Sequence, residues 1–214
     1  MRLDHVSYVA SHDQISDVVN RIGSQIGTAF VDGGIHPKFG TRNFTAPLLN
    51  GQYIEVVCPL DHPATSTTPF GRAVRKKATE GGGWLTWVMS TKKIIEIENQ
   101  LGRKAITGLR IKPNGRELEW KQIGVIESIE DREKPFFIEW IAGEHPSMDG
   151  VPVAEITKII ISGNSQIISN MFDKIIFEIP PLLEIYSNKV ETDDFQNGVM
   201  SVNFAINGTT ISIS

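Results

Sequence analysis

A stretch near the N-terminus recurs further along the chain, and this repeat limits the possible folds more than any other feature. His5-Val-Ser-Tyr-Val-Ala-Ser11 has the same order of residue classes as Trp84-Leu-Thr-Trp-Val-Met-Ser90, which begins at position 84 instead of 5, an offset of 79 residues. The same offset holds without a gap at Ile15 and Ile94, Asn20 and Asn99, and Gly23 and Gly102. Such an unbroken series predicts that one structural unit occurs twice.

Each copy has the pattern of a strand followed by a helix. The repeated stretches are short and rich in β-branched and aromatic residues, which is typical of strands. Apolar residues then recur at helical spacing, at Ile15, Val18, Val19 and Ile22 in the first copy and at Ile94, Ile97 and Leu101 in the second. The glycines Gly23 and Gly102 stand where helices usually stop, so we expect the helices to end there.

Both copies finish with a similar strand that carries an Ile-Glu pair. The first strand, Gly51-Gln-Tyr-Ile-Glu-Val-Val, contains Glu55, and the second, Lys134-Pro-Phe-Phe-Ile-Glu-Trp-Ile, contains Glu139. The segments between the opening and the final strand have nearly the same length in the two copies. Each copy is therefore expected to be a β-α-β-β-β module.

A third and more degraded copy follows. Ile156-Thr-Lys-Ile-Ile-Ile-Ser162 matches the opening strand, and the Asn207-Gly208 pair between alternating segments predicts a hairpin near the end of the chain. We therefore expect an α+β fold in which residues 1–79 and 80–152 form two paired modules whose curled mixed sheet encloses a cup. Residues 153–214 are expected to form a third, degenerate β-α-β-β-β-like module.

Composition and missing motifs exclude several classes of function. The formal charge of −4 and the pI near 5.8 give no basic surplus for nucleic acid, and Cys58 as the one cysteine excludes an internal disulfide. The apolar runs are too short to span a bilayer, and the N-terminus lacks the features of a secretory signal. No dinucleotide-binding, phosphate-loop or serine-hydrolase motif occurs, so we expect no nucleotide cofactor. The sequence favours a soluble, cytoplasmic protein without a membrane or nucleic-acid partner.

The paired modules resemble a known superfamily. Leu3-Asp-His-Val on the first strand, Gly34-Ile-His-Pro-Lys-Phe-Gly-Thr-Arg-Asn43 and Tyr53-Ile-Glu-Val are similar to the vicinal oxygen chelate superfamily, and most of all to its glyoxalase-like subgroup. That superfamily includes glyoxalase I, extradiol dioxygenases, and fosfomycin and bleomycin resistance proteins. The resemblance covers the chain to about Pro152. It implies a cup that, in active relatives, holds a divalent metal by residues from the first and last strands of each module.

Carried over position by position, the resemblance implies three metal ligands, namely His5, Glu55 and Glu139. The fourth ligand position is Trp84, whose indole offers an N–H donor and cannot bind a metal. A histidine with two carboxylates suits Zn, Fe, Mn or Ni, and one of the two carboxylates, Glu55 or Glu139, would leave the metal and act as the catalytic base. Without a metal, the same residues would form the polar floor of a small-molecule pocket.

Five residues are candidates for contact with a substrate: His36, Arg42, Asn43, Trp84 and Trp120. The first three lie in a glycine-rich segment that could close over the cup, with Arg42 binding a substrate carboxylate through two parallel hydrogen bonds. The same segment could simply be a turn that enters a strand. Trp84 would stack on a planar substrate if it faces the cup, and Trp120 would line the pocket.

Two functions follow from this interpretation. The first is a metal-dependent lyase, isomerase or dioxygenase that acts on a small oxygenated molecule. The second is a non-catalytic protein that sequesters a small molecule without a metal. The unpaired third module predicts either a homodimer or the packing of residues 153–214 against the first two modules.

Overall fold

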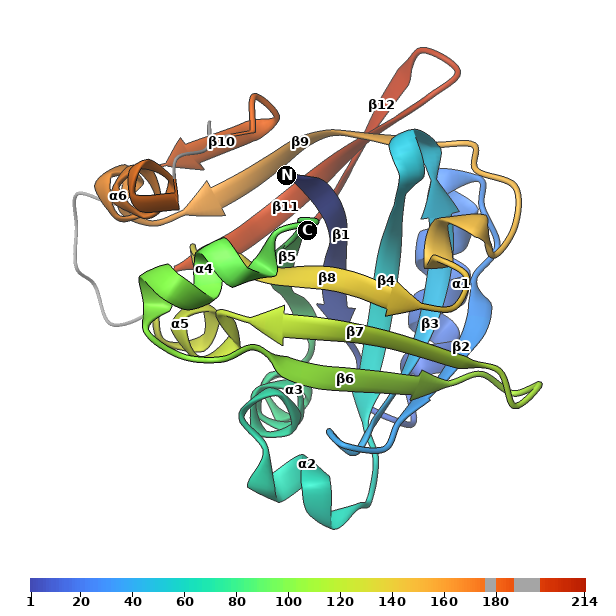
Figure 1. Cartoon of the computed structure of the whole chain (residues 1–214). Coiled ribbons are helices and arrows are strands. Elements are labelled where there is room, and N and C mark those ends of the chain that lie inside the picture. The colour runs from blue at the N-terminus through green and yellow to red at the C-terminus, as the bar shows by residue number, and fades with distance from the viewer. Residues whose placement is uncertain (176–179, 187–196) are drawn as a thin grey trace.

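The two repeats fold into two curled four-stranded sheets that close into one barrel, seen in the computed structural model of residues 1–175, 180–186 and 197–214 (Figure 1). The first module consists of β1 (Arg2–Val9), α1 (Ile15–Ile26), β2 (Val31–His36), β3 (Thr41–Leu48), a 3-10 turn (Leu49–Gly51) and β4 (Gln52–Pro59). The second consists of β5 (Gly83–Ser90), α4 (Ile94–Leu101), β6 (Ile106–Ile111), β7 (Glu117–Ile123), α5 (Val125–Glu130), β8 (Phe136–Ala142) and a 3-10 turn (Pro146–Met148). Between them lie α2 (Pro63–Thr67) and α3 (Pro69–Thr79).

The strand order around the barrel follows the repeat. It is β1-β4-β3-β2-β6-β7-β8-β5, so each module contributes one continuous half. Within each half the opening strand pairs in parallel with the final strand, as β1 does with β4 and β5 with β8. The halves join where β1 runs antiparallel to β5 and where Ile35 of β2 pairs with Ile111 of β6. The expected α+β fold of repeated modules is confirmed.

The end of the first helix differs from the prediction. Helix α1 continues past Gly23 and stops at Gly27, whose left-handed φ of 67° closes the last turn. Gly23 is needed for another reason, because a Cβ there would lie 2.9 Å from the carbonyl oxygen of Thr28. Helix α4 ends at Gly102 as predicted, also with a left-handed φ, of 64°.

Helix α3 closes one end of the barrel. Its buried residues Phe70 and Val74 join a cluster inside the barrel that includes Trp120 and Phe136. Figure 1 shows α2 and α3 together at this end, below the strands. The cluster leaves room in the barrel interior above α3, and that space becomes the site described below.

The third segment forms a separate sheet with its own strand order. It comprises β9 (Glu155–Ser162), α6 (Ser165–Ile175), β10 (Leu183–Tyr186), β11 (Gly198–Ile206) and β12 (Thr209–Ile213). The order β10-β9-β11-β12 puts the opening strand beside β10 and β11, whereas in the first two modules the opening strand lies beside the final one. The element sequence of the module is retained, but its strand pairing is not.

This sheet packs on the outside of the barrel. Phe172 of α6 stacks on Trp87 of β5 with ring centroids 6.1 Å apart, and the indole N–H of Trp84 donates to the carbonyl oxygen of Ile213 at 2.9 Å. Buried residues of the third segment share one hydrophobic cluster with β1 and β5. The described part of residues 153–214 therefore packs against the first two modules. The expected homodimer stays a prediction. In the part of the chain that the structure describes, no helix is both long and apolar enough to cross a bilayer.

Candidate active site

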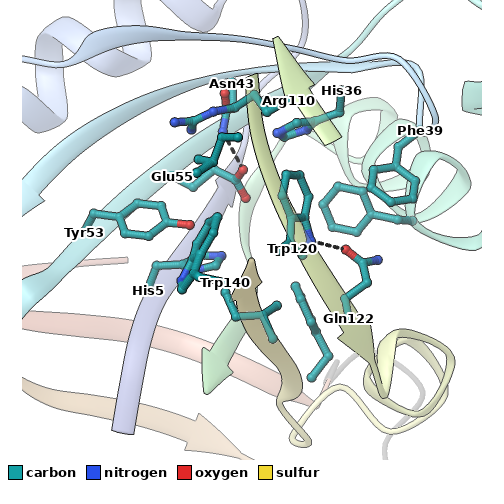
Figure 2. A pocket seen from close by; sticks show the side chains of 14 residues that line it. His5, His36, Phe39, Asn43, Tyr53, Glu55, Arg110, Trp120, Gln122 and Trp140 are labelled. Atoms are coloured by element: carbon teal, nitrogen blue, oxygen red, sulfur yellow. Dashed lines mark hydrogen bonds between the residues drawn. The ribbon is translucent and has the colours of Figure 1, made fainter. Parts of the chain in front are cut away.

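A pocket lies inside the barrel, and Figure 2 shows the side chains that line it. They are His5, His36, Phe39, Asn43, Tyr53, Glu55, Phe70, Arg110, Leu118, Trp120, Gln122, Phe136, Ile138 and Trp140. The empty space is about 420 Å³, part of it open to solvent. The cavity itself has a volume of about 30 Å³, room for about two water molecules. A larger ligand therefore requires some of these side chains to move.

Glu55 of β4 is a buried carboxylate with both oxygens engaged. Ser7 Oγ donates to Oε2 at 2.7 Å, and Asn43 Nδ2 donates to Oε1 at 2.8 Å. Burial alone would raise the pKa of Glu55, but nearby His5 and the hydrogen bonds from Ser7 and Asn43 lower it below its usual value. Glu55 is therefore ionised at neutral pH and is a weak base.

His5 of β1 is held in place by a buried acid. Its Nδ1 lies 3.0 Å from Oδ2 of Asp4, and its ring stacks on Tyr53 with centroids 4.4 Å apart. Burial would raise the pKa of Asp4, but hydrogen bonds from His145 and His5 hold it well below the usual range. An ionised carboxylate can only accept a hydrogen bond, so Nδ1 of His5 carries a proton and donates to Asp4, and Nε2 is the ring nitrogen on the side away from that contact.

His36 of β2 is a second histidine in the pocket, in a more apolar setting. Its ring lies edge-on to Trp120 and Phe39, and its Nδ1 lies 3.0 Å from Thr41 Oγ1. Burial, against the opposing effect of Glu55 and with a smaller contribution from the charge of Arg110, lowers the pKa of His36 from 6.5 to about 4. His36 is therefore neutral at physiological pH.

The three predicted metal ligands do not meet. His5 and Glu55 face the pocket, whereas Glu139 lines a different groove on the barrel exterior with Arg2, Lys92 and other residues. Ile138 and Trp140 on either side of Glu139 point into the pocket, so strand alternation turns Glu139 outward.

The pairing register of the strands explains why Glu139 does not face the pocket. In the first module Glu55 is opposite Ser7, and the repeat aligns Ser7 with Thr86 of the second module. In the second module Ser90 is opposite Ile138, and the same register continued along β5 would place position 134 opposite Thr86. Glu139 stands five positions further on, and an odd shift moves a side chain to the other face of a sheet.

The donors in the pocket do not fit a divalent metal. Among the described residues no group of three or more His, Cys, Asp or Glu side chains is arranged to hold a metal ion. Both oxygens of Glu55 already accept hydrogen bonds, and the guanidinium of Arg110 lines the same pocket. A cation would therefore meet a positive charge and an occupied carboxylate.

The predicted substrate residues separate into two groups. His36, Asn43 and Trp120 line the pocket. Arg42 points away from it, pairs with Asp32 and lies over the ring of Phe44, because its neighbour Asn43 takes the inward position on β3.

Trp84 also lies outside the pocket. It packs edge-on against Tyr8 and contacts the third sheet through its hydrogen bond to Ile213. Irregularities in the β1–β5 pairing, between Leu3 and His5 and between Ser7 and Tyr8, change which side chains face the interior. Of the described side chains that line the pocket, none comes from β5.

Sequence reasoning missed several pocket residues. Tyr53 could have been found, because it shares a strand face with Glu55. Gln122 could have been found from the predicted Trp120, because it lies two positions further on the same face of β7; the indole N–H of Trp120 donates to Oε1 of Gln122 at 2.7 Å (Figure 2). Arg110 of β6 and Asp4 carry no local signal, because their roles depend on strands from distant parts of the chain.

A barrel of two β-α-β-β-β modules around one interior pocket defines a protein of the vicinal oxygen chelate class. The chain belongs to the glyoxalase-like domain family, whose family model matches residues 3–167. No curated protein matches the sequence.

Several solved structures are similar to this chain at low sequence identity. A hypothetical protein from Staphylococcus aureus is 18% identical with a TM-score of 0.60, covering 98% of this chain and 83% of that one. Methylmalonyl-CoA epimerase from Mycobacterium tuberculosis is 11% identical with a TM-score of 0.44, covering 67% of this chain and 89% of that chain. A variant of the Streptomyces coelicolor methylmalonyl-CoA epimerase in complex with 2-nitronate-propionyl-CoA is 12% identical, with a TM-score of 0.43 and coverage of 69% of this chain and 98% of that chain.

Proposed function

We propose that this protein is an isomerase- or lyase-type enzyme that moves a proton on a small oxygenated molecule bound inside the barrel. One observation carries the proposal: a histidine oriented by a buried aspartate faces the same pocket as an ionised glutamate. His5 and Glu55 are near neighbours, because β1 and β4 are paired and His5 is opposite Tyr53 while Ser7 is opposite Glu55.

His5 is the base in this proposal. Its Nε2 accepts a proton from a carbon next to a carbonyl group of the substrate, and the same ring returns the proton in the second half of the reaction. Asp4 remains ionised and holds Nδ1–H in the required orientation. The carboxylates of Asp4 and Glu55 both stabilise the imidazolium that forms between the two steps.

The proposed step needs no metal ligand, and the donors that face the pocket do not fit a divalent ion. Glu55, with its lowered pKa and two hydrogen bonds, supports His5 by its charge and does not itself take the proton.

The test is hydrogen exchange in D2O followed by NMR, with a panel of small 2-oxo and 2-hydroxy acids and their esters. Wild-type protein is expected to exchange a carbon-bound proton next to the carbonyl of at least one of them. The variant His5→Gln should lose this exchange, and His12→Gln, an exposed histidine, should keep it. Exchange that survives in folded His5→Gln, or its absence in wild type across the panel, would overturn the proposal.

A second candidate is a protein that sequesters a small molecule without reaction. The aromatic walls favour it, since Trp120 and Trp140 both line the pocket, with ring centroids 5.7 Å apart, and offer aromatic contacts to an apolar ligand. Tight binding of a planar compound without any exchange or product formation would support this candidate over the enzyme.

A further inference from the structure

Arg110 is the charged group in the pocket that the proposed chemistry leaves unused. It lies on β6, its side chain is 2% exposed, and it lines the pocket beside Asn43 and His36 (Figure 2). Within the described part of the chain, Nε and Nη2 of Arg110 have no hydrogen-bond partner. A buried guanidinium with unused donors is costly unless something that enters the site completes its hydrogen bonds.

The nearest acid does not supply these bonds. Oδ2 of Asp149 lies 3.6 Å from Nη2 of Arg110, too far for a hydrogen bond, and Oδ1 of the same carboxylate accepts from Lys112 Nζ at 2.6 Å. Asp149 balances part of the positive charge of Arg110 but accepts no hydrogen bond from Nη2 of that guanidinium. Glu55 is engaged by Ser7 and Asn43.

A glycine keeps the space beside the guanidinium open. A Cβ at Gly33 would lie 2.2 Å from Oδ1 of Asn43 and 3.0 Å from Nη1 of Arg110. Oδ1 of Asn43 is itself without a hydrogen-bond partner among the described residues. Any side chain at position 33 would clash with the amide of Asn43 and crowd the guanidinium of Arg110. Glycine at this position therefore allows both groups to stay where they are.

We propose that Arg110 binds the carboxylate of a small carboxylic acid whose planar body lies against Trp120 and Trp140. A carboxylate matches the forked geometry of a guanidinium through two parallel hydrogen bonds. It is also smaller than a phosphate, which suits a cavity with room for about two water molecules. The inference names the substrate class of the proposed function and rests on it in that respect, although binding itself requires no reaction.

The test is a binding titration followed by tryptophan fluorescence and calorimetry, with benzoate, pyruvate, their neutral amides and inorganic phosphate as probes. Wild-type protein is expected to bind at least one of the carboxylates about 10- to 100-fold more tightly than its amide, as the loss of a charge-assisted hydrogen-bond pair predicts. Arg110→Gln should remove this preference, and Arg110→Lys should keep part of it. Arg116→Gln, at an exposed arginine paired with Glu144, should leave it unchanged.

Three results would overturn the inference: no preference of the wild type for either carboxylate, a preference that survives in folded Arg110→Gln, or tighter binding of phosphate than of both carboxylates. If Arg110→Gln fails to fold, Arg110→Lys and the wild-type comparison of acid with amide still decide the question. Measuring proton exchange and carboxylate binding on the same wild-type protein separates the two proposals, because binding to Arg110 requires no reaction. Carboxylate binding without exchange would sink only the proposed reaction.

Discussion

Asp4 and His145 are 141 positions apart in the chain, yet Oδ1 of Asp4 lies 3.2 Å from Nε2 of His145. The backbone N–H of Ser147 donates to Nδ1 of His145, so the proton of this ring is on Nε2 and points at Asp4. Trp140 Nε1 donates to the same oxygen at 3.2 Å. The loop that follows β8 in the second module therefore fixes the acid that orients His5 in the first.

Replacement of this acid tests the arrangement. Asp4→Asn should lower the free energy of unfolding by roughly 2 to 4 kcal/mol, because buried donors of three side chains lose a charged acceptor. It should also let His5 adopt the other tautomer, visible in the ¹⁵N NMR shifts of the ring. Asp61→Asn, at an exposed aspartate, is the control. An unchanged stability and tautomer in Asp4→Asn would contradict the assignment.

His36 predicts a specific dependence of stability on pH. Its pKa is about 4 in the folded protein and 6.5 in the unfolded chain, so between these values the unfolded chain binds more protons. The contribution of neutral His36 to the free energy of unfolding is complete above pH 6.5. It declines as the pH falls towards 4, where the loss amounts to about 3 kcal/mol. The loss of Asp4 stabilisation is separate, because it begins only as the pH falls below 3.8.

Urea denaturation between pH 7.5 and 4.5 measures this contribution. The stability of His36→Gln should depend less on pH than that of the wild type, whereas His12→Gln should follow the wild type. Parallel curves for His36→Gln and wild type over the whole range would show that His36 is not buried in its neutral form.

Trp84 and Trp120 should respond differently to the same substitution. Trp84→Phe removes the hydrogen bond to Ile213 and should cost about 1 to 2 kcal/mol of stability without altering binding of a probe in the pocket. Trp120→Phe should weaken probe binding instead, because Trp120 forms part of the pocket wall. Weakened binding in Trp84→Phe at unchanged stability would place Trp84 in the pocket after all.

The donor arrangement makes a prediction about metals. Protein dialysed against Zn²⁺, Mn²⁺ or Ni²⁺ should retain less than one ion per chain, measured by elemental analysis, and chelation should leave proton exchange unchanged. Stoichiometric metal that disappears in the His5→Ala, Glu55→Ala double variant would restore the metal-dependent function.

The repeat predicts the barrel of two modules, but not the strand order of the third sheet or the whole site. Residue classes at a constant offset identify two equal modules, and Ile15 and Ile94 begin their helices 79 positions apart as expected. Glu139 was misplaced because an Ile-Glu pair looks the same on either face of a strand, and the face depends on pairing register. Arg110 was missed because its significance is its unused donors, which only the packed barrel reveals.

The unequal contribution of the two halves has a stereochemical consequence. His5 approaches a bound molecule from the β1 side alone, and β5, the matching strand of the second half, offers no counterpart among the described pocket side chains. With its acid group fixed at Arg110, a substrate would present one prochiral face to the imidazole. Deuterium would then enter from a single side, so the labelled product would be one mirror-image form.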